Sequence, residues 1–174
     1  MQRAVLLLVV GAFIPRAAAA QGDPLGPEFR ANTFTTSLQH NSVVASDTSG
    51  NFVVVWQSLG QDGSLSGVFG QRYASSGVSL GPEFRVNTHT SGNQRNTSVA
   101  SDAAGNFIVV WDSYPQDGFG GGVFGQRYAS SGAALGPEFR VNTAVIDNQY
   151  FASVASDSSR QLRGRLGELG TRWR

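Results

Sequence analysis

The stretch SVASDAAGNFIVVW at residues 98–111 decides the fold class. It consists of two β-prone runs that are joined by Asp-Ala-Ala-Gly. An Asp that opens a tight turn hydrogen-bonds to the backbone downstream, and a Gly that closes the turn tolerates a positive φ, so the stretch predicts a β-hairpin. The run at residues 106–111 is almost wholly apolar, which predicts a central strand that is buried on both faces.

This hairpin belongs to a repeat of 55 residues. The hexapeptide LGPEFR begins at residues 25, 80 and 135, and the first two copies agree at about two-thirds of their positions without insertion or deletion. A fixed period of this length is typical of propellers, solenoids and arrays. Each copy holds four short β-prone runs and none with a helical period, so we predict an all-β fold of tandem propeller-like blades, each with about four antiparallel strands. The array is expected to be incomplete, because a propeller closes with about four to eight blades.

In the first copy the expected strands are residues 28–32, 42–46, 51–56 and 68–73. Stacked blades would bury aromatic and β-branched side chains between them. The expected core consists of Phe29, Phe52, Val54, Trp56, Phe69, Tyr73 and their equivalents Phe84, Phe107, Val109, Trp111, Phe124 and Tyr128. Gly70 is expected to allow close packing at a point where a side chain would collide.

Composition divides the chain into three parts. Residues 1–20 carry Arg3, an apolar run and four alanines, the pattern of a secretory signal peptide that is cleaved after Ala20; the alternative is an uncleaved anchor or a buried helix. The chain is therefore expected to be exported, to be secreted, periplasmic or on the cell surface, and to have no stable membrane span after cleavage. Residues 21–159 form the β-repeat region, divided into repeat 25–79, repeat 80–134 and partial repeat 135–159.

The last segment, residues 160–174, departs from the repeat. It is rich in Arg and Leu and begins where the other copies continue with Gly-Asn-Phe. Codons permitted for this segment, read one base later, encode Gly-Asn-Phe-Val-Val-Val-Trp in register with residues 50–56. We therefore predict that a frameshift near codon 159 truncated a longer array; the alternative is a natural basic C-terminal cap.

The strings GPEFRVNT, SVASDxxGNFxVVW, QDG and GVFGQRY run through residues 25–159. Together they resemble a tandem repeat of large exported bacterial proteins, whose repeats are taken as β-propeller-like and often sit beside calcium-binding or adhesin-like modules. The Asp-x-x-Gly-Asn turn also resembles the hairpin turn of NHL-type blades. The resemblance implies an exported array of blades and gives no defined activity.

Charge and composition exclude several classes of function. Residues 21–159 hold six Arg against eleven Asp and Glu, so we expect no nucleic acid partner, which would require a clustered basic face. The chain has no Cys, which removes disulfides and thiolate metal sites. No Gly-x-Ser-x-Gly elbow occurs, and His40 and His89 stand at different repeat positions without a partner at metal-ligand spacing.

Two loops carry the candidate metal ligands. The string QDG places Asp62 in the first copy and Asp117 in the second, where Asp112 adds a further carboxylate. Calcium binds about six to eight oxygens, and each loop offers one carboxylate in common. Asp62 and Asp117 are therefore calcium candidates, the alternative being a solvated Asp in a glycine-rich loop. No other cofactor is expected.

Charged residues that recur in each copy are expected to be structural. The turn aspartates recur as Asp47, Asp102 and Asp157. A catalytic role would require the same chemistry in every blade, so we expect them to fix the hairpin turn. Glu28, Arg30 and Arg72 recur likewise and are expected to form an ion pair at the rim between blades, rather than a ligand clamp.

We therefore interpret the chain as an exported repeat protein that acts as a binding or structural, adhesin-like module and is not an enzyme. The expected partner is an unknown extracellular ligand, either protein or glycan, and open sheet edges would allow self-association. The alternative is a secreted propeller-type hydrolase that acts on polysaccharide. Such an enzyme would need non-repeated carboxylates that converge on one pocket.

Overall fold

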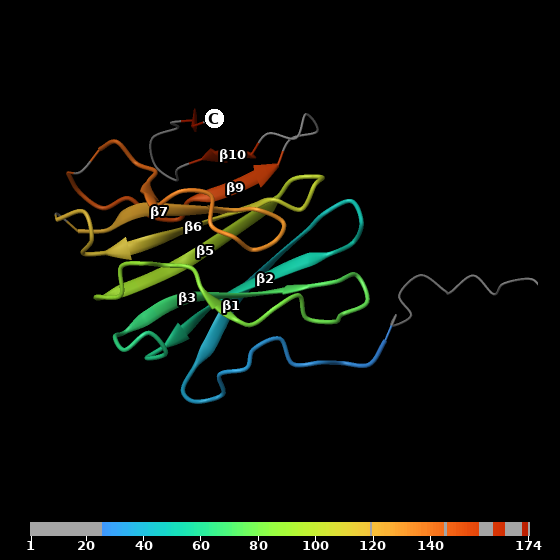
Figure 1. Ribbon diagram of the computed structural model, residues 1–174. Helices are drawn as coiled ribbons and strands as arrows, with labels where there is room; N and C mark the ends of the chain where they lie inside the picture. Colours follow the sequence, from blue (N-terminus) through green and yellow to red (C-terminus); the bar gives the residue numbers. More distant parts are fainter. Residues whose placement is uncertain (1–25, 119, 145, 157–161, 166–171, 174) are drawn as a thin grey trace, which may run out of the picture.

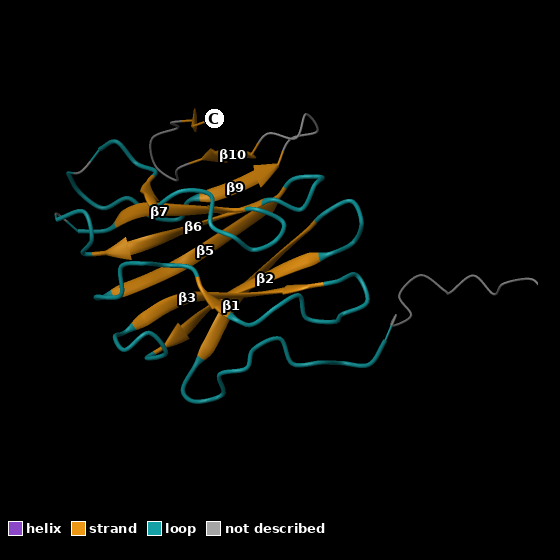
Figure 2. Ribbon diagram, viewed as in Figure 1, coloured by secondary structure: helices purple, strands orange, loops and turns teal. Residues whose placement is uncertain are grey.

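The computed structural model describes residues 26–118, 120–144, 146–156, 162–165 and 172–173. These residues contain eleven strands and no helix (Figure 2), so the predicted all-β class is confirmed, and no described segment is a helix able to cross a membrane. The strands are β1 (Gln39–Ser46), β2 (Phe52–Leu59), β3 (Ser66–Tyr73), β4 (Phe84–Arg85), β5 (Asn93–Ser101), β6 (Phe107–Tyr114), β7 (Gly122–Tyr128), β8 (Phe139–Arg140), β9 (Ser153–Ser156), β10 (Leu162–Arg165) and β11 (Arg172–Trp173).

The first eight strands form two four-stranded blades (Figure 1). Strands β1 to β4 pair antiparallel in chain order, and strands β5 to β8 do the same. A single parallel pair, Ser66 with Asn93, joins the two blades into one eight-stranded sheet. Within a blade the pairing is more extensive, and β2 and β3 pair along their whole lengths. The prediction of adjacent blades is therefore confirmed for the first two copies.

Each blade takes its fourth strand from the next sequence copy. Strand β4 lies in the LGPEFR segment of the second copy, yet it pairs with β3 of the first. Just beyond it, the Val86 N–H donates to the Val68 carbonyl at 2.8 Å, and Asn87 Oδ1 accepts from the Val68 N–H at 2.7 Å. The strand expected at residues 28–32 does not form, because the described residues hold no preceding blade with which it could pair.

The apolar core lies between neighbouring blades. Of the expected core, Phe29 is 50% exposed, and Phe52 and Val54 are only partly buried, because no described segment covers that side of the first blade. The cluster between the first two blades consists of Val53, Val55, Val68, Val86, Phe107, Val109, Trp111, Phe124 and Tyr128. A smaller cluster between the second blade and the third copy consists of Ala100, Ile108, Val110, Val123 and Ala152.

Gly70 allows the close packing that the sequence predicts. A Cβ at Gly70 would lie 3.0 Å from Cζ of Phe84, and Gly125 meets Phe139 at the same distance in the second blade. The Phe84 ring also packs against the ring of Tyr128 in the second blade, with ring centroids 5.4 Å apart. The LGPEFR segment at residues 80–85 therefore links two blades through its backbone and through its aromatic ring.

Strands β9, β10 and β11 form a separate three-stranded sheet. Leu162 of β10 pairs with Ser156 of β9, as Phe107 pairs with Ser101 in the second blade. The backbone of the tail thus keeps the register of the repeat as far as residue 165, although its composition has changed. No fourth strand of this sheet occurs among the described residues. The expected signal peptide 1–20, Asp157 and most of the tail lie outside them.

Candidate functional site

The two ends of each blade differ in how closely the copies agree. One end holds the turns at residues 47–51 and 74–77 and their equivalents, and we call it the turn end. The opposite end holds the entry to the first strand, residues 34–43, and the loop between the second and third strands, residues 57–66, with their equivalents. Most differences between the first two copies fall in these segments, so we call this the variable end.

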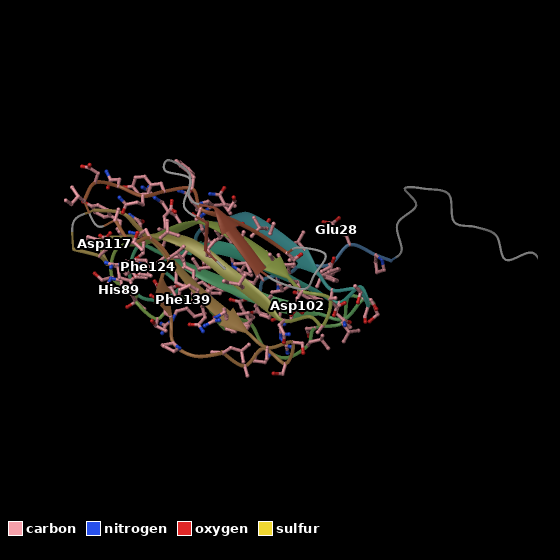
Figure 3. The ribbon with its side chains drawn as sticks, turned by 90° about the horizontal axis from the view of Figure 1, so that it is seen from above. Glu28, His89, Asp102, Asp117, Phe124 and Phe139 are labelled. Atoms are coloured by element: carbon pink, nitrogen blue, oxygen red, sulfur yellow. The ribbon has the colours of Figure 1, made fainter. Side chains whose placement is uncertain are left out.

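The turn end is held by side-chain hydrogen bonds that recur in both blades. Asp102, which Figure 3 labels at this end, accepts from the N–H groups of Ala104 and Asn106 through Oδ1, both at 2.9 Å. Its Oδ2 accepts from Nδ2 of Asn106 at 2.9 Å, and Oδ1 of Asn106 accepts from the Ser130 N–H at 3.1 Å. Asp47 makes the same set of bonds in the first blade. The predicted turn role of these two aspartates is confirmed.

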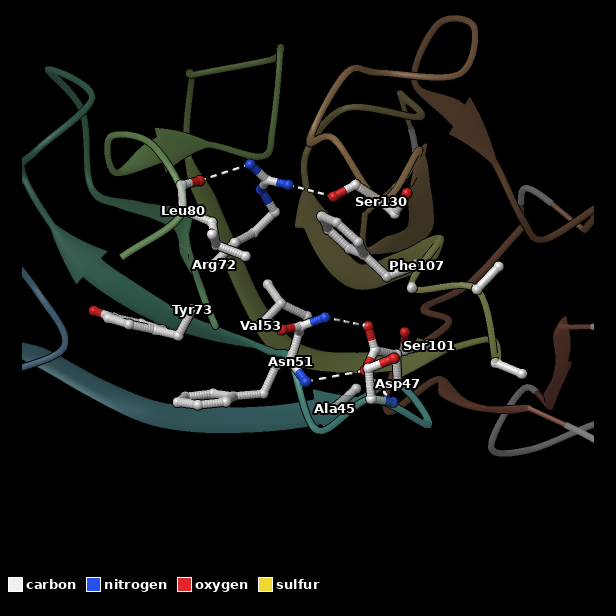
Figure 4. A pocket seen from close by; sticks show the side chains of 15 residues that line it. Ala45, Asp47, Asn51, Val53, Arg72, Tyr73, Leu80, Ser101, Phe107 and Ser130 are labelled. Atoms are coloured by element: carbon white, nitrogen blue, oxygen red, sulfur yellow. Dashed lines mark hydrogen bonds between the residues drawn. The ribbon is translucent and has the colours of Figure 1, made fainter. Parts of the chain in front are cut away.

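A cavity of about 350 Å³ opens between the two blades at the turn end (Figure 4). Asp47 lines it from the first blade and Phe107 from the second. The guanidinium of Arg72 donates to the carbonyl of Leu80 at 2.6 Å and to the carbonyl of Ser130, and burial lowers the pKa of Arg72. Asp47 and Arg72 recur in the second copy and already bind backbone groups. We therefore interpret the cavity as part of the structural contact between blades.

The rim ion pair expected of Glu28, Arg30 and Arg72 is not formed among the described residues, where Arg30 donates to the carbonyl of Asn32 at 3.1 Å and Arg72 to that of Leu80. Glu83, the equivalent of Glu28, does not pair with Arg72 either. Instead, Oε2 of Glu83 accepts from the N–H and Oγ1 of Thr33 at 2.7 and 2.8 Å, and Oε1 accepts from Nε2 of Gln61 at 2.5 Å. Burial raises the pKa of Glu83, but the hydrogen bonds from Thr33 and Gln61 outweigh burial and lower the pKa below its usual value. Glu138 is held in the same way in the second blade. Neutral donors thus satisfy the carboxylate, while Arg72 binds carbonyls.

The calcium candidates Asp62 and Asp117 lie in the β2–β3 and β6–β7 loops, at the variable end. Figure 3 labels Asp117. Oδ2 of Asp62 accepts from Nδ2 of Asn87 at 3.1 Å, and Oδ1 accepts from the Ser64 N–H at 3.3 Å. A Cβ at Gly67 would come within 2.5 Å of that Oδ2, so the carboxylate leans over the loop backbone. In the described part of the chain, no group of three or more His, Asp and Glu side chains could hold a metal ion. Calcium binding here stays a prediction.

Three different side chains stand at one repeat position of the variable end. They are His40, Arg95 and Tyr150. Each is followed by a residue in the left-handed region, namely Asn41 with φ 52°, Asn96 with φ 54° and Phe151 with φ 58°. In β1 and β5 this residue falls within the bulge where the pairing register shifts. A left-handed backbone is uncommon outside Gly, and for a Phe it is a strained conformation of the kind that clusters at ligand sites.

Arg95 and Tyr150 meet where the second and third copies adjoin. The Cζ atom of Arg95 lies 5.6 Å from the centroid of the Tyr150 ring, within cation–π distance. The ring also lies against Gly121, where a Cβ would collide with it; the first copy has Ser66 at this position. The Tyr150 hydroxyl donates to Oδ1 of Asn148 at 3.0 Å, which also accepts from the Gly121 N–H. These contacts fix the ring in one orientation.

Asp112, on β6, is a buried carboxylate, which the sequence indicated only as an additional acid near the calcium candidate Asp117. Its side chain is 1% exposed and accepts from Nδ2 of Asn96 at 2.7 Å and from the Phe151 N–H at 3.1 Å. Burial raises the pKa of Asp112 to about 6, although these hydrogen bonds and the charge of Arg95 lower it. Asp112 therefore holds both left-handed residues. The replacement of Gln57 by an acid at an equivalent buried position is the signal that could have identified it.

Comparison with known proteins gives no family model and no curated protein that matches the chain. Among solved structures, an endo-arabinase from Bacteroides thetaiotaomicron is similar at 16% identity and a TM-score of 0.50, with 83% of this chain and 57% of that chain covered. An α-L-arabinofuranosidase from Lactobacillus brevis is similar at 10% identity and a TM-score of 0.51, with 82% and 49% covered. The chain thus spans about half the length of each structure. At such identities the likeness is one of fold, and it agrees with the blade architecture.

Proposed function

We propose that the chain is an exported, non-catalytic binding module whose blades hold an extracellular ligand at the variable end. The observation that carries this proposal is that one backbone geometry presents His40, Arg95 and Tyr150 in turn. Side chains needed for folding recur from copy to copy. Positions that change on an unchanged backbone are the ones available to a ligand, as on other rigid scaffolds that carry variable loops.

The state of the carboxylates supports binding over catalysis. Glycoside hydrolysis requires two carboxyl groups on either side of the scissile bond. Asp102 and Glu138 each accept several hydrogen bonds that hold the fold, and the same holds for their first-copy equivalents. The described partners of Asp112 are Asn96, Phe151, Ala152 and Arg95, with no second acid among them.

The alternative function, hydrolysis of a polysaccharide, is favoured by two observations. The two similar solved structures are named as an endo-arabinase and an arabinofuranosidase, both of which act on sugars. A carboxyl group with a pKa near 6, such as that of Asp112, is suited to donating a proton near neutral pH. The first observation also makes a glycan the ligand class to test first for a binding module.

The full chain, purified from the culture medium, should be applied to a glycan array, and the same glycans should be assayed for newly released reducing ends. We expect binding without turnover, and an N-terminus at Gln21. If the chain cleaves a glycan and the Asp112→Asn variant does not, the binding-module proposal is wrong and the chain is a hydrolase. If no glycan binds and none is cleaved, a sugar ligand is wrong. An N-terminus at Met1 would contradict the expected signal peptide.

A further inference from the structure

We infer that the variable end binds a sugar acid, whose carboxylate pairs with Arg95 and whose ring packs against the aromatic side chains beside it. This inference rests on the proposed binding function and names the class of its ligand. Three features of the structure support it: the guanidinium of Arg95, the exposed aromatic rings of the variable end and the buried carboxylate of Asp112.

The guanidinium of Arg95 is a cation with unused donors. The side chain is exposed, and its described interactions are the cation–π contact with Tyr150 and the charge interaction with Asp112. No described residue accepts a hydrogen bond from it, so its five N–H groups are available to a ligand. A planar guanidinium binds a carboxylate through two parallel hydrogen bonds, which are stronger than bonds between neutral groups. The cation–π contact with Tyr150 keeps the guanidinium at this surface, where it can form such a pair.

Exposed aromatic rings at the variable end offer an apolar surface. Phe151 is 70% exposed, and its ring meets that of Tyr150 edge-on with centroids 6.3 Å apart. Tyr114, at the end of β6, is 46% exposed. An aromatic ring with a free face can pack against the C–H side of a sugar ring, and a Tyr adds a hydroxyl for hydrogen bonding. The strained backbone of Phe151, with φ 58°, is held by the hydrogen bond of its N–H to Asp112 and leaves the ring displayed at the surface.

Asp112 supports this surface from within. It is buried and bound to Asn96 and to the N–H of Phe151, so it positions these residues and is not exposed to a ligand. Its hydrogen bonds do not reach Arg95, whose donors remain unused. His40 occupies the equivalent position on β1, which packs beside β5, and its exposed imidazole can hydrogen-bond to a further sugar unit.

The test measures binding of the full chain to oligogalacturonates, and to the same oligomers after reduction of their carboxylates to alcohols, in the presence of a chelator. We expect the reduced oligomers to bind at least about tenfold more weakly, the effect of losing one charge-assisted pair. Arg95→Gln should weaken binding of the acidic oligomers by a similar factor and leave binding of the reduced ones unchanged.

Arg127→Gln is the matched control. Arg127 is also exposed and lies over an aromatic ring, with its Cζ 5.5 Å from the Phe139 centroid, but it stands at a position where both of the first two copies have Arg. Its replacement should leave binding unchanged, even where it lowers the melting temperature as a change at the turn end does, whereas Arg95→Gln should leave the melting temperature at the value of the parent chain. Equal affinity for acidic and reduced oligomers would overturn the acid specificity while leaving the binding function intact. Equal losses in the two Arg variants would overturn the site. If no glycan binds to the chain, a sugar is the wrong class of ligand for the proposed binding module.

Discussion

The turn end and the variable end of the blades show two different kinds of repetition. At the turn end, side chains and backbone recur together, so that Asp47 and Asp102 make the same hydrogen bonds at nearly the same distances. At the variable end the backbone recurs while several exposed side chains differ, and Arg95 and Tyr150 share one repeat position without sharing their chemistry. The copies therefore act as a natural substitution experiment on one fold. What they keep serves folding, and what they change is available for recognition.

Substitutions at the two ends should therefore differ in their effects on stability and on ligand binding. A change at the turn end should reduce stability and leave ligand binding unaltered. A change at an exposed position of the variable end should do the reverse. Asp112 is the informative exception, because it is at the variable end and yet fully buried.

The largest expected effect is the pH dependence that Asp112 introduces. Its folded pKa of about 6 lies above its usual value of 3.8, so the folded state binds the proton more tightly than the unfolded state does. The contribution to stability is therefore present below about pH 4 and is lost as the pH rises through about 6, by roughly 3 kcal/mol for a difference of this size. Urea unfolding at pH 4 and pH 7 should show this loss in the parent chain and not in Asp112→Asn.

Asp147→Asn is the control for this experiment, because Asp147 is an exposed aspartate of the third copy. It should keep the pH dependence of the parent chain. If Asp112→Asn also keeps it, the buried carboxylate is not the group that titrates.

The next effect in size is at the turn end. Asp102→Ala removes the acceptor for the Ala104 and Asn106 N–H groups and for Nδ2 of Asn106, and it should lower the free energy of unfolding by about 2 kcal/mol. Asp102→Asn keeps one oxygen for the two N–H groups and should cost about half as much. Neither variant should change glycan affinity. A loss of binding in either one would contradict the assignment of folding to the turn end and of binding to the variable end.

Much of the fold could be predicted from the sequence because the decisive signals are local. The turn chemistry of Asp102 and Gly105, the apolar run that follows it and the period of 55 residues each depend on neighbouring residues or on simple counting. The packing of Phe84 over Gly70 was predictable in kind, since a Gly inside a strand implies close approach.

The parts that sequence could not predict depend on partners far away in the chain. To predict that β4 joins the preceding blade, one must know which strand of that blade lacks a partner. Phe29 is half-exposed because its segment has no preceding blade to join among the described residues. The Glu83 carboxylate was expected to meet an Arg, and only the structure shows Thr33 and Gln61 around it. At the variable end, the sequence shows that the copies differ at Arg95, but the stacking on Tyr150 arises from the junction of two copies.

The smallest expected effect concerns Asp62, which lies at the variable end but makes hydrogen bonds of the turn-end kind. Its carboxylate accepts from Asn87 and Ser64, so Asp62→Asn should lower the free energy of unfolding by about 1 kcal/mol or less. If these hydrogen bonds are its whole role, the melting temperature of the parent chain will be the same in a chelator and in millimolar calcium. A rise with calcium that Asp62→Asn and Asp117→Asn each reduce would instead show that the QDG loops bind the ion. The parent's calcium response therefore decides whether the variable end contains a second, metal-dependent function beside the one assigned to Arg95.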